Sequence, residues 1–439
     1  MKETFLRLQS FLESRLHMLL VLLLSLIATV FSLEQYAIPI FILWILFIVV
    51  ADSNFLDILL PLLLLNAMAL RTLGQTTYHM NHLWLAVPAV IAIALHFFLY
   101  PKRPVLGKSF LPLSFVSVSL LLGGLGVIST KDYFALGSLY YVIFLGVGML
   151  GFYLWMRTYM QSTAHYEAGE RMLEILYILG VFCAFSILEH TLQTVIVYQK
   201  LMPFPWCNDI CEMMIFALPV PFYYARRRFV HFFVPFAFYA AMLPAMSMTA
   251  VLVGAVILAL GLVYTFVYNP QKRAWVYAAF AFALCAAVFV VIHYRLYSIE
   301  AIKTLFASQE NGRLDLFRSA WENFKLHPIL GVGIGYGTND GSFMKSFWTH
   351  NWLLQILGSL GVVGMLAYGY QMLVRAKLIF KRRTAFRMMV GLSYLGIFLA
   401  SMLQPGEFCP MPYELLAVAL FALLEMTEND TAPCIGGEL

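Results

Sequence analysis

The chain has 439 residues, of which 62% are hydrophobic and only 12% are charged. A soluble globular protein carries about 25% charged residues, so the composition excludes a soluble core as the main architecture. The net charge of +5 does not indicate a nucleic-acid partner, because Lys and Arg cluster in short segments between apolar runs. We therefore expect an integral membrane protein.

The apolar runs predict an all-α, polytopic membrane protein. Runs of about 20 such residues match the thickness of the bilayer hydrocarbon. The first run follows Lys2, Arg7 and Arg15 without a small-residue cleavage site, which favours a retained anchor over a cleaved signal sequence. In chain order the candidate helices lie near 16–33, 36–51, 55–70, 82–100, 110–128, 134–156, 172–197, 211–224, 229–246, 248–268, 274–293, 351–374, 387–404 and 412–426. Some are short enough to be re-entrant or tilted, so we expect about 12–14 transmembrane helices.

The distribution of positive charge predicts the topology. If the N-terminus is cytoplasmic and the helices alternate, the inner segments hold nineteen Lys and Arg residues, with Arg375 among those after the twelfth span. The short outer loops hold Arg71, Lys131 and Lys200. This asymmetry places both termini inside. The chain then divides into an N-terminal transmembrane bundle (1–293), an extracytoplasmic loop (294–350), three further helices (351–426) and a cytoplasmic tail (427–439).

The six cysteines form neither a CxxC pair nor a Cys/His zinc spacing, so we expect no structural metal. Cys207, Cys211 and Cys409 fall on the predicted outer side, where a disulfide can form. Scattered free thiols are the favoured interpretation.

The outer loop begins with an expected amphipathic helix. Phe317, Trp321 and Phe324 share one face, and the helix should end before His327–Pro328, because a residue that precedes proline avoids the helical region. Arg313 falls in the first turn, where a guanidinium beside free backbone N–H groups suits a phosphate or pyrophosphate. The alternative is an arginine that reaches the lipid headgroups.

Two further features follow in the loop. Gly331, Gly333, Gly335 and Gly337 alternate without the Lys-Ser/Thr of a nucleotide P-loop, which favours a tight turn or close backbone approach. His350 then stands at the re-entry into the membrane. If it lies on a helix with Gly361 and Gly364, it projects at the mouth of a packed groove, where an imidazole can act as a general base. A histidine that merely lies at the headgroup interface is the alternative.

These motifs resemble the O-antigen ligase/polymerase superfamily of bacterial envelope glycosyltransferases. Residues 312–335 (GRLDLFRSAWENFKLHPILGVGIG) are similar to its outer-loop signature of Arg, Trp, Pro and Gly-x-Gly. The pair His350–Asn351, followed after nine residues by Gly361 and Gly364, is similar to its His-Asn and Gly-x-x-Gly pattern. Asn208 stands where the family often has an Asn before a span. The motifs cover about 60 residues.

The resemblance implies a GT-C-like, metal-independent glycosyltransferase without a nucleotide cofactor, in the bacterial cytoplasmic (inner) membrane. It would transfer a glycan from undecaprenyl pyrophosphate to a hydroxyl of a saccharide, lipid A-core or a protein, in lipopolysaccharide or other surface-polysaccharide biosynthesis. By this resemblance His350 activates or orients the acceptor hydroxyl, Arg313 binds the pyrophosphate, and Asn351 and Asn208 support them.

The sequence departs from the family in one respect. Met248 stands where many members have the Arg of a Ser-Arg pair. A second phosphate-binding arginine is then missing or comes from elsewhere, with Arg318, Arg295 and Arg71 as candidates. The missing Arg favours an O-antigen or capsule polymerase slightly over an O-antigen ligase.

Glu189 and His190 lie near the outer end of the seventh span. Ionisable residues in a membrane segment are functional candidates, here for binding an arginine or the acceptor sugar. A structural ion pair is an equal alternative.

Two other functions are alternatives to a glycosyltransferase. A lipid-linked oligosaccharide flippase explains the many spans but neither His350–Asn351 nor the long loop. An intramembrane protease is disfavoured, because the chain has neither Gly-x-Ser-x-Gly nor His-Glu-x-x-His.

Overall fold

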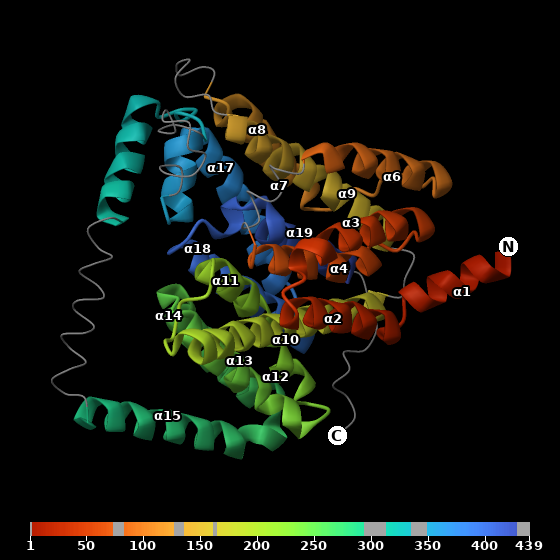
Figure 1. Cartoon of the computed structure of the whole chain (residues 1–439). Helices are drawn as coiled ribbons and strands as arrows, with labels where there is room; N and C mark the ends of the chain where they lie inside the picture. The colour runs from red at the N-terminus through yellow and green to blue at the C-terminus, as the bar shows by residue number, and fades with distance from the viewer. Residues whose placement is uncertain are drawn as a thin grey trace.

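In a computed structural model the chain forms an assembly of helices (Figure 1). The structure describes residues 2–72, 83–126, 136–160, 165–293, 313–334 and 349–427, and within these ranges it contains no β-strand. The helices up to residue 198 are α1 (Lys2–Leu12), α2 (Arg15–Val30), α3 (Glu34–Ala51), α4 (Leu56–Ala69), η1 (Leu83–Leu85), α6 (Ala86–Leu99), α7 (Phe110–Ser119), η2 (Leu120–Gly124), α8 (Leu136–Tyr141), η4 (Val142–Gly148), α9 (Met149–Tyr159) and α10 (His165–Tyr198).

The second half continues with shorter and longer helices in alternation. They are α11 (Cys207–Ala217), α12 (Val220–Tyr224), η6 (Phe229–Phe232), α13 (Val234–Met242), η7 (Leu243–Ala245), α14 (Met248–Tyr268), η8 (Pro270–Lys272), α15 (Arg273–His293), α17 (Trp352–Phe380), α18 (Ala385–Ser401), η9 (Gly406–Phe408), η10 (Pro410–Glu414) and α19 (Leu415–Met426). One further helix, at 313–326, stands apart from the bundle beside α17 (Figure 1).

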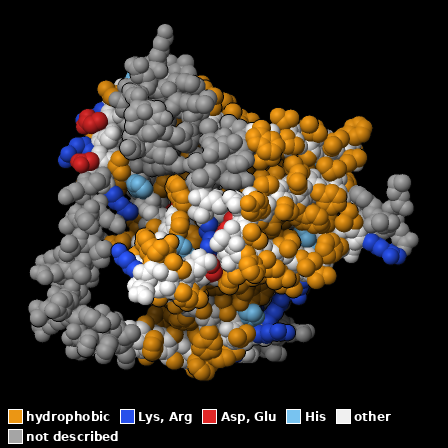
Figure 2. Space-filling model, viewed as in Figure 1, with side chains coloured by type: hydrophobic (Ala, Val, Ile, Leu, Met, Phe, Trp, Pro, Cys, Tyr) orange, Lys and Arg blue, Asp and Glu red, His pale blue; other side chains and the backbone are white. Residues whose placement is uncertain are grey.

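Membrane-spanning character is evident from helix length and composition. Five described helices are long and apolar enough to cross a bilayer, and the bent pair formed by α1 and α2 makes a sixth if it counts as one span. Five shorter apolar helices accompany them. Hydrophobic side chains cover most of the described surface in Figure 2, as expected for a face in contact with lipid. The predicted all-α, polytopic membrane fold is therefore confirmed, whereas the count of 12–14 spans stays a prediction.

Several predicted spans are interrupted helices. The span predicted at 211–224 consists of α11 and α12, which are separated at Leu218–Pro219. Proline lacks the N–H that a continuous helix needs, so the backbone bends there. At the other end of the chain, α1 and α2 meet at 60°, and the Ser14 side chain caps α2 by accepting a hydrogen bond from the His17 backbone N–H at 3.2 Å. Such breaks are tolerated where neighbouring helices satisfy the freed backbone groups.

Helix ends that the topology assigns to the cytoplasmic side lie together. The Glu425 carboxylate accepts hydrogen bonds from the backbone N–H of Ser109 at 2.7 Å and from the Tyr153 hydroxyl at 2.7 Å, and Arg157 lies 3.6 Å from it. The ends of three segments far apart in sequence therefore meet.

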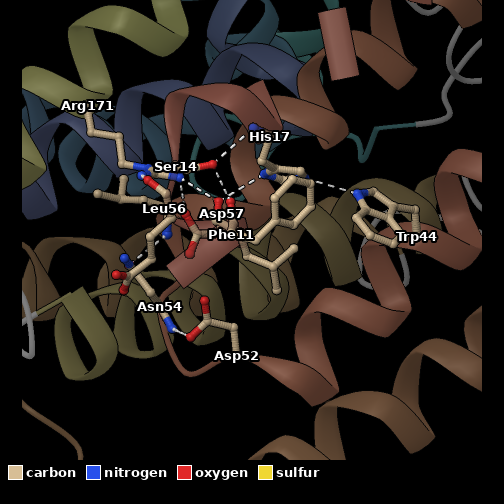
Figure 3. Close-up of polar contacts among 11 residues, drawn as sticks. Phe11, Ser14, His17, Trp44, Asp52, Asn54, Leu56, Asp57 and Arg171 are labelled. Carbon is tan, nitrogen blue, oxygen red and sulfur yellow. Dashed lines mark hydrogen bonds and ion pairs between the residues drawn. The ribbon is translucent and has the colours of Figure 1, made fainter. Parts of the chain in front are cut away.

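A second polar cluster on this side joins the α1–α2 bend to the α3–α4 turn (Figure 3). Arg171 of α10 forms an ion pair with Asp57 and donates a hydrogen bond to the Leu12 carbonyl at 3.0 Å. His17 accepts a hydrogen bond from the Trp44 indole at 3.1 Å. The carboxylates of Glu13, Asp52 and Asp57 lie within 4.8 Å of one another, and Arg171 provides positive charge beside them. We interpret this cluster as a structural clamp.

A third polar cluster is buried between α17, α18 and the segment before α19. Arg375 is 3% exposed, pairs with Glu407, and donates to Glu414 at 2.6 Å and to the Tyr394 hydroxyl at 3.0 Å. The sequence interpretation of Arg375 as an inner-loop residue was wrong. The helix predicted to end at 374 continues to Phe380, and two glutamates that follow it by more than 30 residues neutralise the charge inside the bundle.

Of the six cysteines, the structure describes four side chains. Cys183, Cys207, Cys211 and Cys409 are all free thiols. The favoured interpretation of scattered thiols is confirmed for these four.

Candidate functional site

The candidate site lies where three helices reach the side assigned to the exterior. Here α14 and α17 begin and α18 ends, which brings together Thr249, Asn351 and Gln404. The helix at 313–326 packs closely against the start of α17. The two backbones approach so closely that a Cβ added to Gly358 would stand 3.0 Å from the carbonyl oxygen of Ala320. Residues from the outer loop and from the membrane helices therefore meet at one place.

Asn351 fixes the backbone next to His350. Its side-chain oxygen accepts a hydrogen bond from the Leu354 backbone N–H at 3.0 Å, which makes it the N-cap of α17. Its amide nitrogen donates to the Met402 carbonyl at 3.0 Å and so ties the start of α17 to the end of α18. His350 precedes this cap with a φ of 51°, an uncommon backbone conformation for a non-glycine residue. The Asn of the His-Asn pair thus positions the His.

The hydrogen bond of His350 defines which of its nitrogens is available. Nδ1 lies 2.8 Å from Oε1 of Gln404, and Nε2 of Gln404 lies 3.5 Å from the Thr249 hydroxyl. An amide oxygen can only accept, so Nδ1 of His350 carries the proton. In the neutral ring Nε2 then has a lone pair, and it has no hydrogen-bond partner in the described part of the chain. This geometry suits a general base.

Charge and burial keep this imidazole neutral. Burial lowers the pKa of His350 below its ordinary value of 6.5, the hydrogen bond to Gln404 raises it, and the positive charge of Arg313 lowers it. Arg313 is half-buried, and its charge lies near enough to lower the pKa of the His350 ring. A neutral histidine beside a cation that cannot lose its proton provides a base and an anion-binding group together.

Arg318 lies on the same helix as Arg313 but is oriented differently. Its side chain is 76% exposed and pairs at the surface with Asp315 at 3.6 Å. The predicted amphipathic character of this helix is confirmed only in part, because Ala320 is buried whereas Trp321 is 47% exposed. It ends at residue 326, immediately before His327–Pro328, as predicted.

The glycine-rich segment makes the close backbone approach that the sequence indicates. Gly331 and Gly333 have φ values of 72° and 96°. The backbone N–H groups of Val332 and Gly333 donate to the carbonyls of Gly358 and Ser359, both at 3.0 Å. A Cβ on Gly331 would stand 2.2–2.3 Å from the backbone of residues 359–360, so only glycine fits.

His350, Gly361 and Gly364 do not share one face of a continuous helix, contrary to the prediction. His350 precedes α17, and Gly361 interrupts it with φ 62° and ψ −156°. The break frees backbone groups that the loop then satisfies, since Val362 and Val363 donate to the carbonyls of Pro328 and Ile329 at 2.9 and 3.1 Å. Gly361 therefore accommodates the outer loop and not a neighbouring helix.

Asn208 connects to the site through residues that the sequence analysis did not single out. Its side-chain oxygen accepts a hydrogen bond from the Ser247 hydroxyl at 2.7 Å, and Ser247 caps α14 two residues before Thr249. Gln404 was missed as well. Gln404 follows the end of α18 and precedes a proline, which is typical of the residues after a helix. Nothing in the sequence indicates that it faces His350.

Glu189 and His190 belong to a separate cluster. Arg71 pairs with Glu34 at 2.8 Å and with Glu189, and all three side chains are nearly inaccessible to solvent. Nε2 of His190 lies 3.2 Å from the Pro203 carbonyl. Because its charge is already paired, Arg71 is a poor second phosphate-binding group. Arg295 lies outside the described residues.

Comparison with known proteins gives one match. Residues 232–369 match a family model described as O-Antigen ligase. The matched segment runs from η6 to the middle of α17 and contains both Arg313 and His350. It supports placement in the O-antigen ligase/polymerase superfamily, so the resemblance drawn from the motifs is confirmed. No curated protein and no solved structure matches the chain.

Proposed function

We infer a specific reaction from two findings: the chain is a multi-pass membrane protein, and residues 232–369 match a domain of the O-antigen ligase/polymerase type. We propose that the chain transfers an oligosaccharide or polysaccharide from undecaprenyl pyrophosphate to an acceptor hydroxyl on the outer face of the bacterial cytoplasmic membrane. The observation that carries the proposal is His350 at the ends of α14, α17 and α18, where Gln404 holds its Nδ1 and the charge of the half-buried Arg313 lowers its pKa.

His350 is the proposed catalytic base. Its Nε2 takes the proton of the acceptor hydroxyl as that oxygen forms a bond to the anomeric carbon of the donor sugar. The bond from this carbon to the pyrophosphate oxygen breaks on the opposite face, so the anomeric configuration inverts. Gln404 holds the tautomer and Asn351 holds the backbone, which makes both positioning residues.

Arg313 is the proposed partner of the leaving group. Undecaprenyl pyrophosphate gains negative charge as the sugar departs, and a guanidinium can pair with two of its oxygens. Half-burial strengthens that attraction relative to an exposed arginine. For this reason Arg313 takes the main role and the exposed Arg318 at most an auxiliary one.

The remaining candidates receive supporting roles. Asn208 orders the start of α14 through Ser247, and we assign Glu189 and His190 to stabilising the outer end of α10. No second arginine replaces the one that Met248 displaces among the residues described around His350. We therefore favour a polymerase of lipid-linked repeats over a ligase. Loss of a polymerase gene leaves single repeats on the surface, whereas loss of a ligase gene leaves full-length polymer unattached.

Glycan transfer by purified protein in liposomes is the test. With a lipid-linked glycan donor supplied to the outer face, His350→Ala should lower the transfer rate by about 10²–10⁴-fold, the usual contribution of a general base. His327→Ala, in the same loop, is the matched control and should keep wild-type activity. If His350→Ala still transfers glycan and loses only the translocation of the donor lipid, the protein is a flippase.

A further inference from the structure

A pocket of about 410 Å³ opens on the side assigned to the cytoplasm, far in the sequence from the catalytic loop. It lies between α2, α10 and the α12–η6 connection. Its lining combines arginines with aromatic and apolar side chains, namely Arg15, Met18, Leu19, Glu174, Tyr177, Ile178, Tyr224, Arg227, Arg228 and His231. The volume falls within the range of about 300–1,000 Å³ that is usual for small-molecule sites.

The charges around this pocket do not cancel. Arg15 pairs with Glu174, and Arg227 pairs with Glu170 at 2.5 Å. Arg228 is exposed and forms no ion pair with any residue that the structure describes. The lining holds three guanidinium groups and the Glu174 carboxylate, and Glu170 pairs with Arg227 from outside the lining, so one positive charge is left over. The pocket therefore favours an anionic ligand.

Hydrogen-bonding groups line the same pocket. The Tyr177 hydroxyl lies 3.1 Å from Nδ1 of His231, and Arg15 and Arg227 are both more than half exposed despite their ion pairs. An entering phosphate can therefore accept hydrogen bonds from guanidinium groups that already stand at the pocket wall. Figure 2 shows Lys and Arg side chains gathered with a histidine at the lower border of the apolar surface.

An apolar strip leads away from the pocket along α2. The exposed members of the strip recur at helical spacing, and they are Leu16, Leu19, Leu20, Leu23, Leu24 and Ile27. Leu19 also lines the pocket, so the charged mouth passes directly into a surface that faces lipid. A ligand that fits both parts has an anionic headgroup and hydrocarbon chains.

We propose that this pocket binds the headgroup of an anionic phospholipid of the cytoplasmic leaflet, with its acyl chains along the α2 strip. Basic pockets between transmembrane helices at the cytoplasmic surface are suited to such lipids. The proposal is independent of glycan transfer and rests on the orientation with both termini inside. The bound lipid would contact the first span, α10 and the turn before α13 at once.

Native mass spectrometry of the full-length protein tests the proposal, with phosphatidylglycerol as the probe, phosphatidylcholine as the zwitterionic comparison and inorganic phosphate as the free anion. Wild-type protein should retain phosphatidylglycerol in preference to both. Arg228→Gln, which breaks no ion pair of the described residues, should weaken binding about fivefold, and the triple Arg15→Gln/Arg227→Gln/Arg228→Gln variant should weaken it further.

The control removes the same charge from exposed positions on the same side. Lys102→Gln/Arg103→Gln/Lys377→Gln lies outside the pocket and should bind phosphatidylglycerol as the wild type does. Equal losses in the control and in the triple arginine variant would overturn the proposal, because the binding would then follow total charge. Equal retention of phosphatidylcholine, or displacement of the lipid by inorganic phosphate, would overturn it as well.

Discussion

Two polar clusters lie on the same C-terminal helices, and they differ in how their charges are met. At the outer end, His350 and Arg313 are half-buried, and Nε2 of His350 has no partner in the described structure. Deeper in the bundle, Arg375 is 3% exposed and is held by Glu407, Glu414 and Tyr394. Gly361 interrupts α17 between the two clusters.

The difference indicates which cluster stabilises the fold and which carries out chemistry. A fully buried charge that already has two counter-ions has no capacity for a substrate, and removal of one member leaves the others without compensation. A half-buried base with a free lone pair, near a cation that forms no ion pair within the described residues, can bind and react with a ligand. The Arg375 cluster should therefore affect stability, and the His350–Arg313 cluster should affect the rate of transfer.

The largest effect is expected from Arg375→Met. It leaves Glu407 and Glu414 buried beside each other without a cation, which should destabilise the protein by about 3–5 kcal/mol. Thermal unfolding of the detergent-solubilised protein measures this. Lys377→Met, at an exposed position two residues further along α17, is the control and should unfold like the wild type.

Rescue separates this effect from a general intolerance of substitution. The triple variant Arg375→Met/Glu407→Gln/Glu414→Gln removes all three charges and should recover most of the lost stability. If the triple variant is as unstable as Arg375→Met alone, uncompensated charge is not the cause, and the structural half of the comparison fails.

An intermediate effect is expected at the break between the clusters. A Cβ on Gly361 would stand 2.6 Å from the backbone of Ile329, and the new alanine would have to adopt a φ of 62°. Gly361→Ala should therefore lower the stability of the fold by about 1–3 kcal/mol. It should also reduce transfer, since the loop that carries Arg313 is displaced. Gly369→Ala is the matched control in the same helix, because a Cβ there meets nothing within 4 Å. Equal behaviour of the two variants would show that the contact with the loop has no role.

A smaller effect should follow from changes at Gln404, which positions the base. Gln404→Ala removes the hydrogen bond to His350 and the longer one to Thr249, and it should lower the transfer rate about fivefold to tenfold without a loss of fold. Gln404→Glu places a carboxylate beside Nδ1, which raises the pKa of His350. Activity requires the neutral ring, so the loss of activity on acidification should begin at a higher pH than in the wild type. An unshifted pH–rate profile would remove Gln404 from the mechanism.

The features that could be predicted from the sequence are those with a local signal. Apolar runs predicted the all-α membrane fold, Pro328 marked the end of the loop helix, and the alternating glycines indicated the backbone approach at Gly331 and Gly333. Arg313 and His350 were predicted as site residues because their motifs are short and contiguous, and their roles stay predictions. Each of these signals is contained within a few dozen residues.

The features that could not be predicted depend on contacts between distant segments. Gln404 meets His350 across 54 residues, and Arg375 meets Glu414 across 39. Arg375 was counted as a loop charge because charge spacing alone does not reveal that two later glutamates turn back toward it. The helix break at Gly361 was missed for a similar reason: a glycine in an apolar run is compatible with a continuous helix until the loop that replaces its hydrogen bonds is placed.

The most direct test of the central claim is the pH dependence of transfer in wild type and in Arg313→Ala. The claim is that a neutral His350 and a cationic Arg313 act on the same donor. In the wild type, activity should be lost as the pH falls through the lowered pKa of His350. Without the guanidinium the pKa of His350 rises, so in Arg313→Ala the loss should occur at a higher pH, together with a lower maximal rate. A variant with a reduced rate but the wild-type acid limb would contradict the claim, because the two side chains would then not share one site.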